Sequence, residues 1–290
     1  MTHNGIYVGR FAPSPTGPLH LGSLCTALGS YLDARAKGGQ WLLRIENIDP
    51  PREQPGAAEA IIRSLQAHQL HWDGEILWQS QRSDAYNHVL HQLLNNSAAF
   101  YCSCSRSQLS TVGGVHRGDC IAPLDRSDAA IRLRVAEDDI HFHDRLLGPI
   151  TQHPANDGDV VLRRRDGLFA YQLAVVVDDE HQGVTDIVRG YDLVSSTGWQ
   201  LLLQRALGYH QRHYLHLPLL VDEHGDKLSK RSYAPPLDDL QPEHNIRQVL
   251  GYLNQPSPPP ELSLTETLNW AVAHYQPNSI PSQPIAINPK

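Results

Sequence analysis

The sequence predicts an α/β protein built on a doubly wound parallel sheet, and three observations carry this prediction. Short apolar runs suited to strands alternate with longer amphipathic runs suited to helices over residues 6–94. Over residues 100–177 the alternation gives way to short runs with turn signals, and it resumes over residues 184–221. A parallel sheet interrupted by an inserted antiparallel module explains this order.

The elements expected in the first part follow the chain directly. A strand at residues 6–8 leads through a turn rich in proline, glycine and serine into a helix at residues 24–36. A second strand follows at residues 41–46. Pro55 is suited to open the next helix, and Ser83 is suited to cap the one after it.

The middle of the chain predicts the antiparallel module. Residues 131–135 alternate apolar residues with arginine, as a half-exposed strand does. Residues 160–177 are typical of two strands joined at Asp166-Gly167, which is a strong hairpin signal. We therefore expect residues 100–190 to form a module inserted into the α/β domain.

The remaining elements return to the α/β pattern. A strand at residues 184–188 is followed by a helix that Ser195 or Ser196 caps and Gly208 stops. A further strand is expected at residues 215–221. The rest of the chain predicts two modest helices, one near residues 246–253 and one after the capping box Ser263-Leu264-Thr265-Glu266, and then an irregular tail.

Composition bounds the class of protein. The 290 residues, 40% hydrophobic and 19% charged, suit a soluble protein with room for two domains. The formal charge of −7 argues against a nucleic-acid binder held by overall positive charge. Arg163-Arg164-Arg165 is either a local basic track or a solvated hairpin. Four cysteines without a secretory signal, and no apolar run of membrane length, favour the cytoplasm and argue against disulfides.

Two stretches suggest a nucleotide site. In the first, a strand, a small-residue turn and a helix start lie at residues 7–23, an arrangement that binds anions through free N–H groups and the helix dipole. There His20 adds a donor, and Gly22 lets a flat ring approach. The second, Lys227-Leu228-Ser229-Lys230-Arg231, suits a loop that closes over phosphates. Taken singly, each has a plainer interpretation, an ordinary strand-to-helix connection and a solvated basic loop.

Together, His20-Leu21-Gly22-Ser23 and Lys227-Leu228-Ser229-Lys230-Arg231 resemble the two signatures of class I aminoacyl-tRNA synthetases. The longer string from Arg10 to Ser23 is similar to the glutamyl branch, as are residues 44–53 and Val176-Val177-Asp178-Asp179. The resemblance covers about residues 5–235. It implies a Rossmann-like catalytic core and, within that branch, is strongest to the short paralogue of glutamyl-tRNA synthetase.

The resemblance also implies site residues. His20 and Gly22 would bind ATP with Mg²⁺, and Lys230, assisted by Lys227, would stabilise the transition state. Arg10 and Arg189 would bind the side-chain carboxylate of glutamate, with a hydrogen bond from Tyr171, and Glu46 would bind the α-ammonium. The pocket would be lined by Phe11, Ala12, Pro13 and Ser14. Asn47 stands where the family usually has an acid. Without the family, Arg189 and Tyr171 are a surface arginine and a hairpin aromatic.

Cys102, Cys104, His116 and Cys120 suit one tetrahedral zinc ion. The C-x-C pair and the H-x3-C pair flank a glycine-rich stretch that can form a loop. Relatives usually have tyrosine at the position of His116. The alternative is reduced thiols on a loop beside an exposed histidine. Cys25, alone in the first helix, is expected to be a small buried residue.

The resemblance implies an ATP-dependent ligase that activates glutamate and transfers it to queuosine, a modified anticodon base of tRNA(Asp) whose cis-diol mimics a terminal ribose. Two rivals stay open: an ordinary synthetase that charges a 3′ end, and a non-catalytic RNA-binding paralogue. The residues expected to bind the substrate glutamate, namely Arg10, Glu46, Tyr171 and Arg189, argue against a nucleotidyltransferase for a non-amino carboxylate. We expect a monomer without an anticodon-binding domain. The expected parts are residues 1–99 and 191–235 for the catalytic domain, 100–190 for the zinc-containing acceptor module and 236–290 for a short helical end.

Overall fold

The structure is a computed structural model that describes residues 5–226, 228 and 235–287. Its strands are β1 (Val8–Phe11), β2 (Gln40–Ile45), β3 (Leu77–Trp78), β4 (Ala99–Cys102), β5 (Ala130–Leu133), β6 (Ile140–Asp144), β7 (Gly148–Gln152), β8 (Val161–Arg163), β9 (Asp186–Gly190), β10 (His213–Leu217), β11 (Leu220–Val221) and β12 (Ile285–Ala286). Its α-helices are α1 (Leu21–Ala36), α2 (Ala57–Ala67), α3 (Ser83–Asn95), α4 (Arg106–Ser110), α5 (Pro154–Asp157), α6 (Tyr171–His181), α7 (Val194–Leu207), α8 (Pro242–Tyr252) and α9 (Leu264–Ala273).

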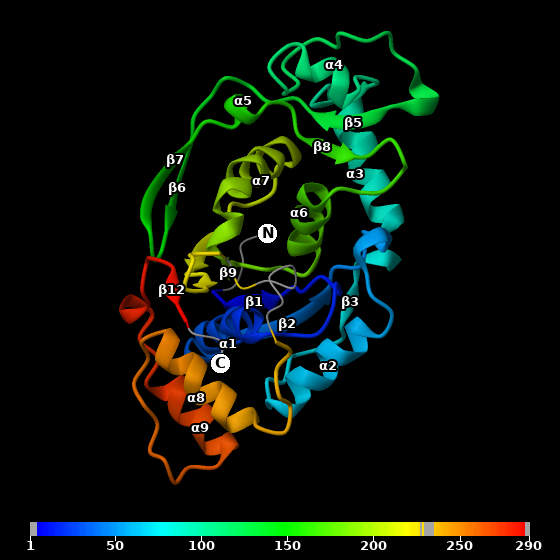
Figure 1. Cartoon of the computed structure of the whole chain (residues 1–290). Coiled ribbons are helices and arrows are strands. Elements are labelled where there is room, and N and C mark those ends of the chain that lie inside the picture. The colour runs from blue at the N-terminus through cyan, green and yellow to red at the C-terminus, as the bar shows by residue number, and fades with distance from the viewer. Residues whose placement is uncertain (1–4, 227, 229–234, 288–290) are drawn as a thin grey trace.

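The predicted parallel sheet lies at the centre of the molecule (Figure 1). β1 pairs in parallel with β2 and β2 with β3, while β9 pairs in parallel with β10. Thr185 joins the two groups, because its backbone N–H donates to the carbonyl of Val8 at 2.9 Å. The order is therefore β3–β2–β1–β9–β10. It reverses between β1 and β9, and open α/β sheets bind their ligands at such a reversal.

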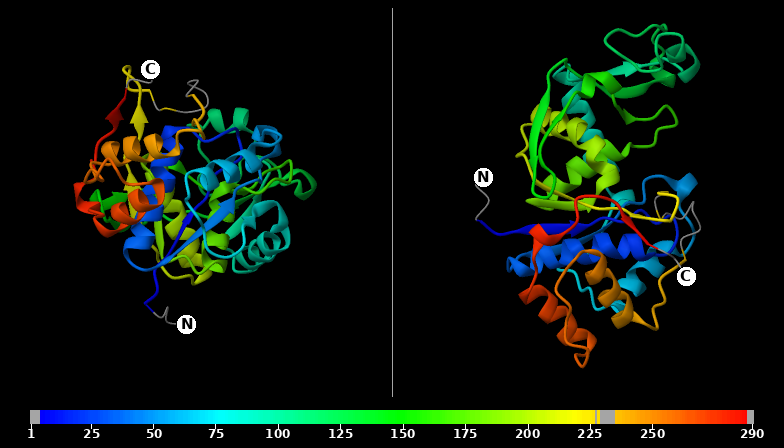
Figure 2. Two further views of the ribbon diagram at one scale, coloured as in Figure 1. Left: turned by 90° about the horizontal axis from the view of Figure 1, so that it is seen from below. Right: turned by 60° about the vertical axis from the view of Figure 1, so that its left-hand side comes forward.

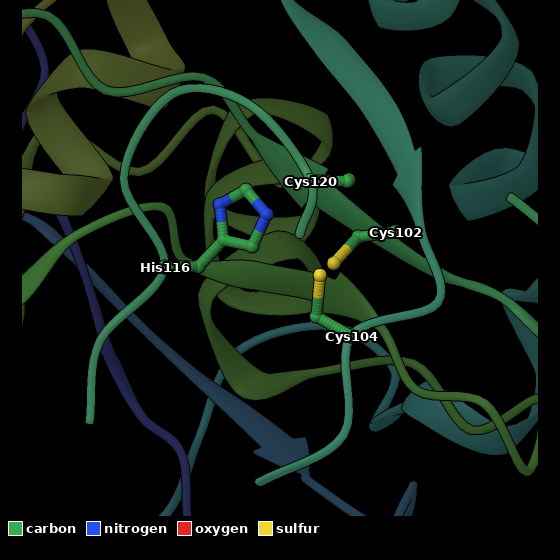
Figure 3. A group of neighbouring side chains, drawn as sticks. All are labelled: Cys102, Cys104, His116 and Cys120. Carbon is green, nitrogen blue, oxygen red and sulfur yellow. The ribbon is translucent and has the colours of Figure 1, made fainter. Parts of the chain in front are cut away.

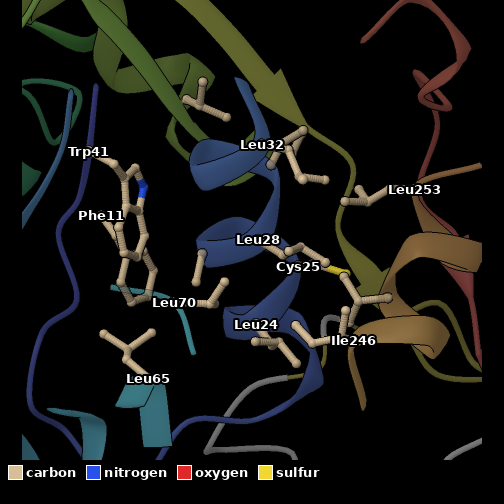
Figure 4. Packing of buried hydrophobic residues seen from close by; sticks show 14 of the residues in the cluster. Phe11, Leu24, Cys25, Leu28, Leu32, Trp41, Leu65, Leu70, Ile246 and Leu253 are labelled. Carbon is tan, nitrogen blue, oxygen red and sulfur yellow. The ribbon is translucent and has the colours of Figure 1, made fainter. Parts of the chain in front are cut away.

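Helices cover both faces of this sheet, as a doubly wound fold requires (Figure 1). α6 and α7 lie on one face, and α1 lies on the other with α8 and α9 packed behind it. Figure 4 shows α1 between Phe11 and Trp41 on one side and Ile246 and Leu253 on the other. Cys25 is buried on this helix, as predicted, and burial raises the pKa of its thiol. No α-helix of the described residues is long and apolar enough to cross a bilayer.

An antiparallel sheet of β4, β5 and β8 lies at one end of the molecule, far from α8 and α9 (Figures 1 and 2). The hairpin of β6 and β7 lies between this sheet and the central one. β6 pairs in parallel with β10 through Asp144 and Tyr214, so the hairpin extends the central sheet. The middle of the chain therefore divides its strands between the two sheets.

One predicted element is wrong: residues 169–177 do not form the second strand of a hairpin. β8 and the turn at Asp166-Gly167 are present, and Arg163 makes a single bridge to Phe169. The chain then enters α6 at Tyr171. A continuous apolar run fits a buried helix as well as a buried strand, and here contacts with α3 and α7 decide for the helix.

The helix ends and the tail agree with expectation only in part. α7 starts at Val194, after a short 3-10 turn with Leu193 as its cap, so neither predicted serine caps it. It ends at Gly208 as predicted, with φ of 71°. α9 has the predicted capping box, in which Ser263 and Glu266 bond reciprocally. The tail is not wholly irregular, because β12 pairs with β11.

Candidate functional site

A cleft of about 910 Å³ opens where the strands β1, β2, β9 and β10 end. Carboxyl ends of parallel strands meet at one edge, which is why side chains from distant segments gather there. Lys227 and Lys230 lie outside the described residues, but Leu228, between them, lines the cleft. The other predicted nucleotide and glutamate residues all line it: Arg10, Phe11, Ala12, Pro13, Ser14, His20, Gly22, Glu46, Tyr171 and Arg189.

His20 caps the first turn of α1 at the mouth of this cleft. Its ring Nδ1 accepts the backbone N–H of Ser23 at 3.3 Å, and its own backbone N–H donates to the Ser23 hydroxyl at 2.7 Å. Because Nδ1 accepts, the proton of a neutral ring lies on Nε2, which can donate to an anion. A side chain at Gly22 would approach the His20 ring to 3.1 Å, so glycine keeps this turn compact.

A buried ion-pair network lies below the cleft. Asp179 accepts from Arg10 at 3.1 Å and from Arg44 at 2.8 Å. Arg44 also contacts Glu46 at 3.3 Å. Burial opposes ionisation of Asp179, but the two guanidinium groups outweigh it and lower the pKa of Asp179. Burial dominates at Glu46 and raises its pKa, although Arg44 and Arg10 oppose that shift.

Arg189 is a buried cation held by neutral groups. It donates through Nε to His216 at 3.0 Å, through Nη1 to Gln200 at 2.7 Å and through Nη2 to Thr197 at 2.8 Å. Two longer bonds, both 3.3 Å, reach the Tyr171 hydroxyl and the Leu193 carbonyl. None of these partners carries a negative charge. A buried guanidinium without a carboxylate is costly, so this end of the cleft favours an anionic ligand.

Tyr171 lies beside this cation. Burial raises the pKa of the phenol, outweighing the opposing effect of Arg189. The hydroxyl accordingly stays protonated at neutral pH, and it can donate a hydrogen bond to an acceptor in the cleft while it accepts one from Arg189.

Two other sequence features now have local partners. Asn47 donates to the Ser80 hydroxyl at 2.9 Å and accepts the Ser80 backbone N–H at 3.0 Å, which ties the loop after β2 to a turn before α3. In the arginine run, Arg164 pairs with Asp166 and approaches Asp49 at 3.6 Å, and Arg165 pairs with Asp128. These pairings favour solvated ion pairs around the turn after β8 over a free basic track.

The four predicted metal ligands come together beside β4 (Figure 3). The ligand atoms of Cys102, Cys104, His116 and Cys120 lie within 4.8 Å of one another. Bonds of about 2.3 Å to sulfur and 2.0 Å to nitrogen would bring them slightly closer around one ion. Burial raises the pKa of Cys120 to about 12. At Cys104 burial acts the same way, but backbone N–H groups of Ala122 and Ile121 outweigh it and lower the pKa.

His116 is oriented for a metal. Its Nδ1 lies 2.7 Å from a carboxylate oxygen of Asp159, while its buried Nε2 has no hydrogen-bond partner among the described residues. A carboxylate behind the ring fixes the tautomer and leaves Nε2 as the ligand atom. Gly158 is needed here, because a side chain would lie 2.3 Å from the His116 carbonyl. The donor set and its geometry thus fit zinc.

Sequence reasoning missed four acidic or histidine side chains that hold the site residues in place. Asp179 belongs to the string Val176-Val177-Asp178-Asp179, and Asp144, Asp159 and His216 belong to none of the motifs. Asp178-Asp179 directly after an apolar run, and His216 inside an apolar strand, are polar residues at positions expected to be buried. A polar residue at a position expected to be buried is the sequence feature by which Asp179 and His216 could have been found.

Comparison with known proteins places these geometries in a family. The model of the class I tRNA synthetase (E and Q) catalytic domain matches residues 7–119 and 123–247. A glutamyl-Q tRNA(Asp) synthetase of Yersinia pseudotuberculosis is 50% identical over 281 residues, which is 96% of this chain and 85% of that protein. One from Pseudomonas aeruginosa is 51% identical and covers 95% of both chains.

The fold agrees with a solved structure as well. The glutamate tRNA ligase of Elizabethkingia meningosepticum, in complex with its amino acid, superposes with a TM-score of 0.81 at 25% identity. The match covers 98% of this chain and 67% of that one. The doubly wound fold predicted from the sequence is therefore confirmed.

Proposed function

The chain belongs to the class I tRNA synthetases of the glutamate and glutamine type, and from that premise we propose that it activates L-glutamate with ATP and transfers it to queuosine in tRNA(Asp). The names of relatives at half identity over nearly the whole chain support the acceptor. The observation that carries the choice of glutamate is Arg189, a buried cation whose described partners are all neutral.

In this proposal the side-chain carboxylate of glutamate completes the charge balance. Arg10 and Arg44 are already matched by Asp179 and Glu46, whereas Arg189 is not. The carboxylate would replace the long bonds of Arg189 and accept from Tyr171. Arg10 makes only long contacts, at 3.1 to 3.5 Å, and could share a donor. The bonds from Arg44 reach Oε1 of Glu46, and the other oxygen of Glu46 would accept from the α-ammonium.

The reaction joins two anions, so the site must neutralise charge and align them. The α-carboxylate of glutamate would attack the α-phosphorus of ATP, and pyrophosphate would leave. Mg²⁺ bound with ATP would offset the charge of the phosphates. The Nε2 proton of His20 and the N-terminus of α1 would hold the phosphates. Gly22 leaves room for the nucleotide. Lys230, assisted by Lys227, would stabilise the negative charge that develops in the transition state. A hydroxyl of the queuosine cis-diol would then attack the glutamyl adenylate and release AMP.

We propose that the cysteine and histidine cluster holds zinc in a structural role. The ion would be bound by Cys102, Cys104, His116 and Cys120 and would fix the loop between β4 and β5. None of the four ligands lines the cleft. The monomeric state, the cytoplasmic location and the domain boundaries stay predictions from the sequence.

Pyrophosphate exchange tests the activation step. Glutamate with ATP and Mg²⁺ should support exchange without tRNA, and glutamine or aspartate should not. Lys230→Ala is expected to lower the exchange rate on the order of a hundredfold, as loss of a main transition-state donor does. Lys37→Ala is the matched control, because it removes the same charge at the end of α1 opposite His20, about 24 Å along the helix axis. Unchanged turnover in Lys230→Ala would refute the role of this lysine. If none of the amino acids tested supports exchange, the proposed enzymatic activity is refuted.

Metal analysis tests the cluster. Protein never exposed to chelator should contain about one zinc per chain, and Cys104→Ser should lose it. Cys25→Ala, which removes a buried thiol outside the cluster, should retain the zinc. Stripping the ion should impair transfer to tRNA more than adenylate formation, because the cluster lies outside the cleft. Folded wild-type protein without zinc would contradict the assignment.

A further inference from the structure

Arg189 is reached from behind by a chain of two buried side chains, Asp144 and His216, that come from neighbouring strands. Asp144 ends β6, His216 lies in β10 and Arg189 lies in β9. β6 and β10 pair in parallel, and His216 is the register partner of Arg189. All three side chains are almost wholly buried. Three strands of the central sheet therefore contribute to one line of polar groups ending at the cleft.

Asp144 is held as an ionised acceptor. One of its oxygens accepts the backbone N–H groups of Leu146 and Leu147, each at 2.9 Å. The other lies 2.7 Å from Nδ1 of His216 and 3.0 Å from the backbone nitrogen of His216. Burial opposes ionisation, but the hydrogen bonds from His216 and the two leucines outweigh it and lower the pKa of Asp144.

This carboxylate fixes the tautomer of His216. With an ionised acceptor at Nδ1, the ring proton lies there and Nε2 is left as a bare acceptor. Burial lowers the pKa of His216, assisted by Arg189 and opposed by Asp144, so the ring stays neutral near neutral pH. The Nε–H of Arg189 donates to this Nε2 at 3.0 Å, and the Tyr214 ring stacks parallel to the imidazole.

We propose that Asp144 and His216 form a positioning pair that fixes the guanidinium of Arg189 for the side-chain carboxylate of the substrate. The inference rests on the proposed glutamate function. His216 occupies Nε of Arg189 and so fixes the rear edge of the guanidinium plane. The longer bond of each Nη group goes to a residue that lines the cleft, Tyr171 for Nη1 and Leu193 for Nη2. The pair adds no negative charge in contact with Arg189, because the carboxylate lies beyond the neutral ring. Arg189 is thereby oriented without being neutralised, and it retains its attraction for an anion.

Two substitutions of His216 separate positioning from packing. In His216→Gln, the longer side chain can place an amide oxygen near the Nε2 position and still accept from Arg189. In His216→Asn, the shorter amide can keep the contact with Asp144 but cannot reach Arg189. Both variants remove the same ring and its stacking on Tyr214, so a loss due to packing should affect them alike.

Glutamate-dependent pyrophosphate exchange gives the readout. His216→Asn should raise KM for glutamate by about tenfold or more, as loss of a hydrogen bond to a charged group does, and change KM for ATP by less than about twofold. His216→Gln should recover most of the glutamate affinity. If both variants lower kcat equally with KM for glutamate unchanged, or if neither changes KM, the positioning role is wrong.

A second readout does not depend on activity. In the wild-type protein the ¹⁵N shifts of His216 should show a protonated Nδ1 and an unprotonated Nε2, and Asp144→Asn should change that state. A proton on Nε2 in the wild type would overturn the pair even if glutamate is activated. Absence of glutamate exchange in a wild type with the expected tautomer would instead refute the proposed function, and with it the role of the pair in binding glutamate.

Discussion

Replacing Asp179 with alanine is expected to lower the free energy of unfolding by about 3–5 kcal/mol, because it leaves buried guanidinium groups without their shared partner. Arg44 would keep Glu46, but among the residues that the structure describes Arg10 would keep only a long bond of 3.4 Å to the Val188 carbonyl. The cost comes from an uncompensated buried charge and exceeds the net contribution of the intact pair. Urea unfolding at neutral pH measures it.

The matched control is Asp128→Ala. Asp128 also pairs with an arginine, Arg165, but both side chains are exposed, so the water around them replaces most of the interaction. Its loss should leave the urea midpoint nearly unchanged. If Asp179→Ala were as stable as the control, the buried network would not hold the cleft together as described.

The same substitution should also change how the free energy of unfolding depends on pH. The pKa of Asp179 is lower in the folded protein than in the unfolded chain. The contribution of Asp179 to the free energy of unfolding is therefore fully present above the ordinary aspartate pKa of about 3.9. It is lost as the pH falls through the lower folded value. Asp179→Ala should therefore lose less stability than the wild type on acidification below about pH 4. Parallel stability curves for the two proteins would contradict the assigned direction.

The central architecture could be predicted from the sequence because it is local. The apolar runs at β1, β2, β9 and β10 read as strands, the capping box at Ser263 identified the start of α9, and Gly208 ended α7. The residues of the cleft were found through the family resemblance. Several lie at or just after the carboxyl ends of β1 and β2, whereas Arg189 lies within β9 and Tyr171 starts α6. The four cysteine and histidine residues of the cluster were grouped by their type and spacing together with the resemblance, and the structure brings their ligand atoms within 4.8 Å of one another.

What could not be predicted depends on contacts between distant segments. Residues 171–177 suit a strand locally, and only packing against α3 and α7 makes them helical. β12 is short and takes its pairing from β11. Asp159 becomes a partner of His116 across 43 residues, and Asp144 of His216 across 72. The sequence can mark His216 as a polar residue in an apolar strand, but no local pattern identifies Asp144 as its partner.

The acceptor of the activated glutamate distinguishes the two nearest alternatives, transfer to queuosine and charging of a 3′ end. Relatives named glutamyl-Q tRNA(Asp) synthetase support queuosine, while the superposition with a glutamate tRNA ligase fits a shared activation step. The cis-diol of queuosine offers a hydroxyl like that of a terminal ribose. The same adenylate could therefore be attacked by either group, and adenylate formation alone does not distinguish them.

The most direct test compares two altered forms of tRNA(Asp) in glutamate transfer. The first carries queuosine but lacks its 3′-terminal adenosine, and the second has an intact 3′ end but no queuosine. Transfer should persist at the wild-type level with the first and vanish with the second, and tRNA(Glu) should not be charged. If the trimmed tRNA fails while the unmodified tRNA accepts glutamate, the protein charges a 3′ end and the proposed function is wrong.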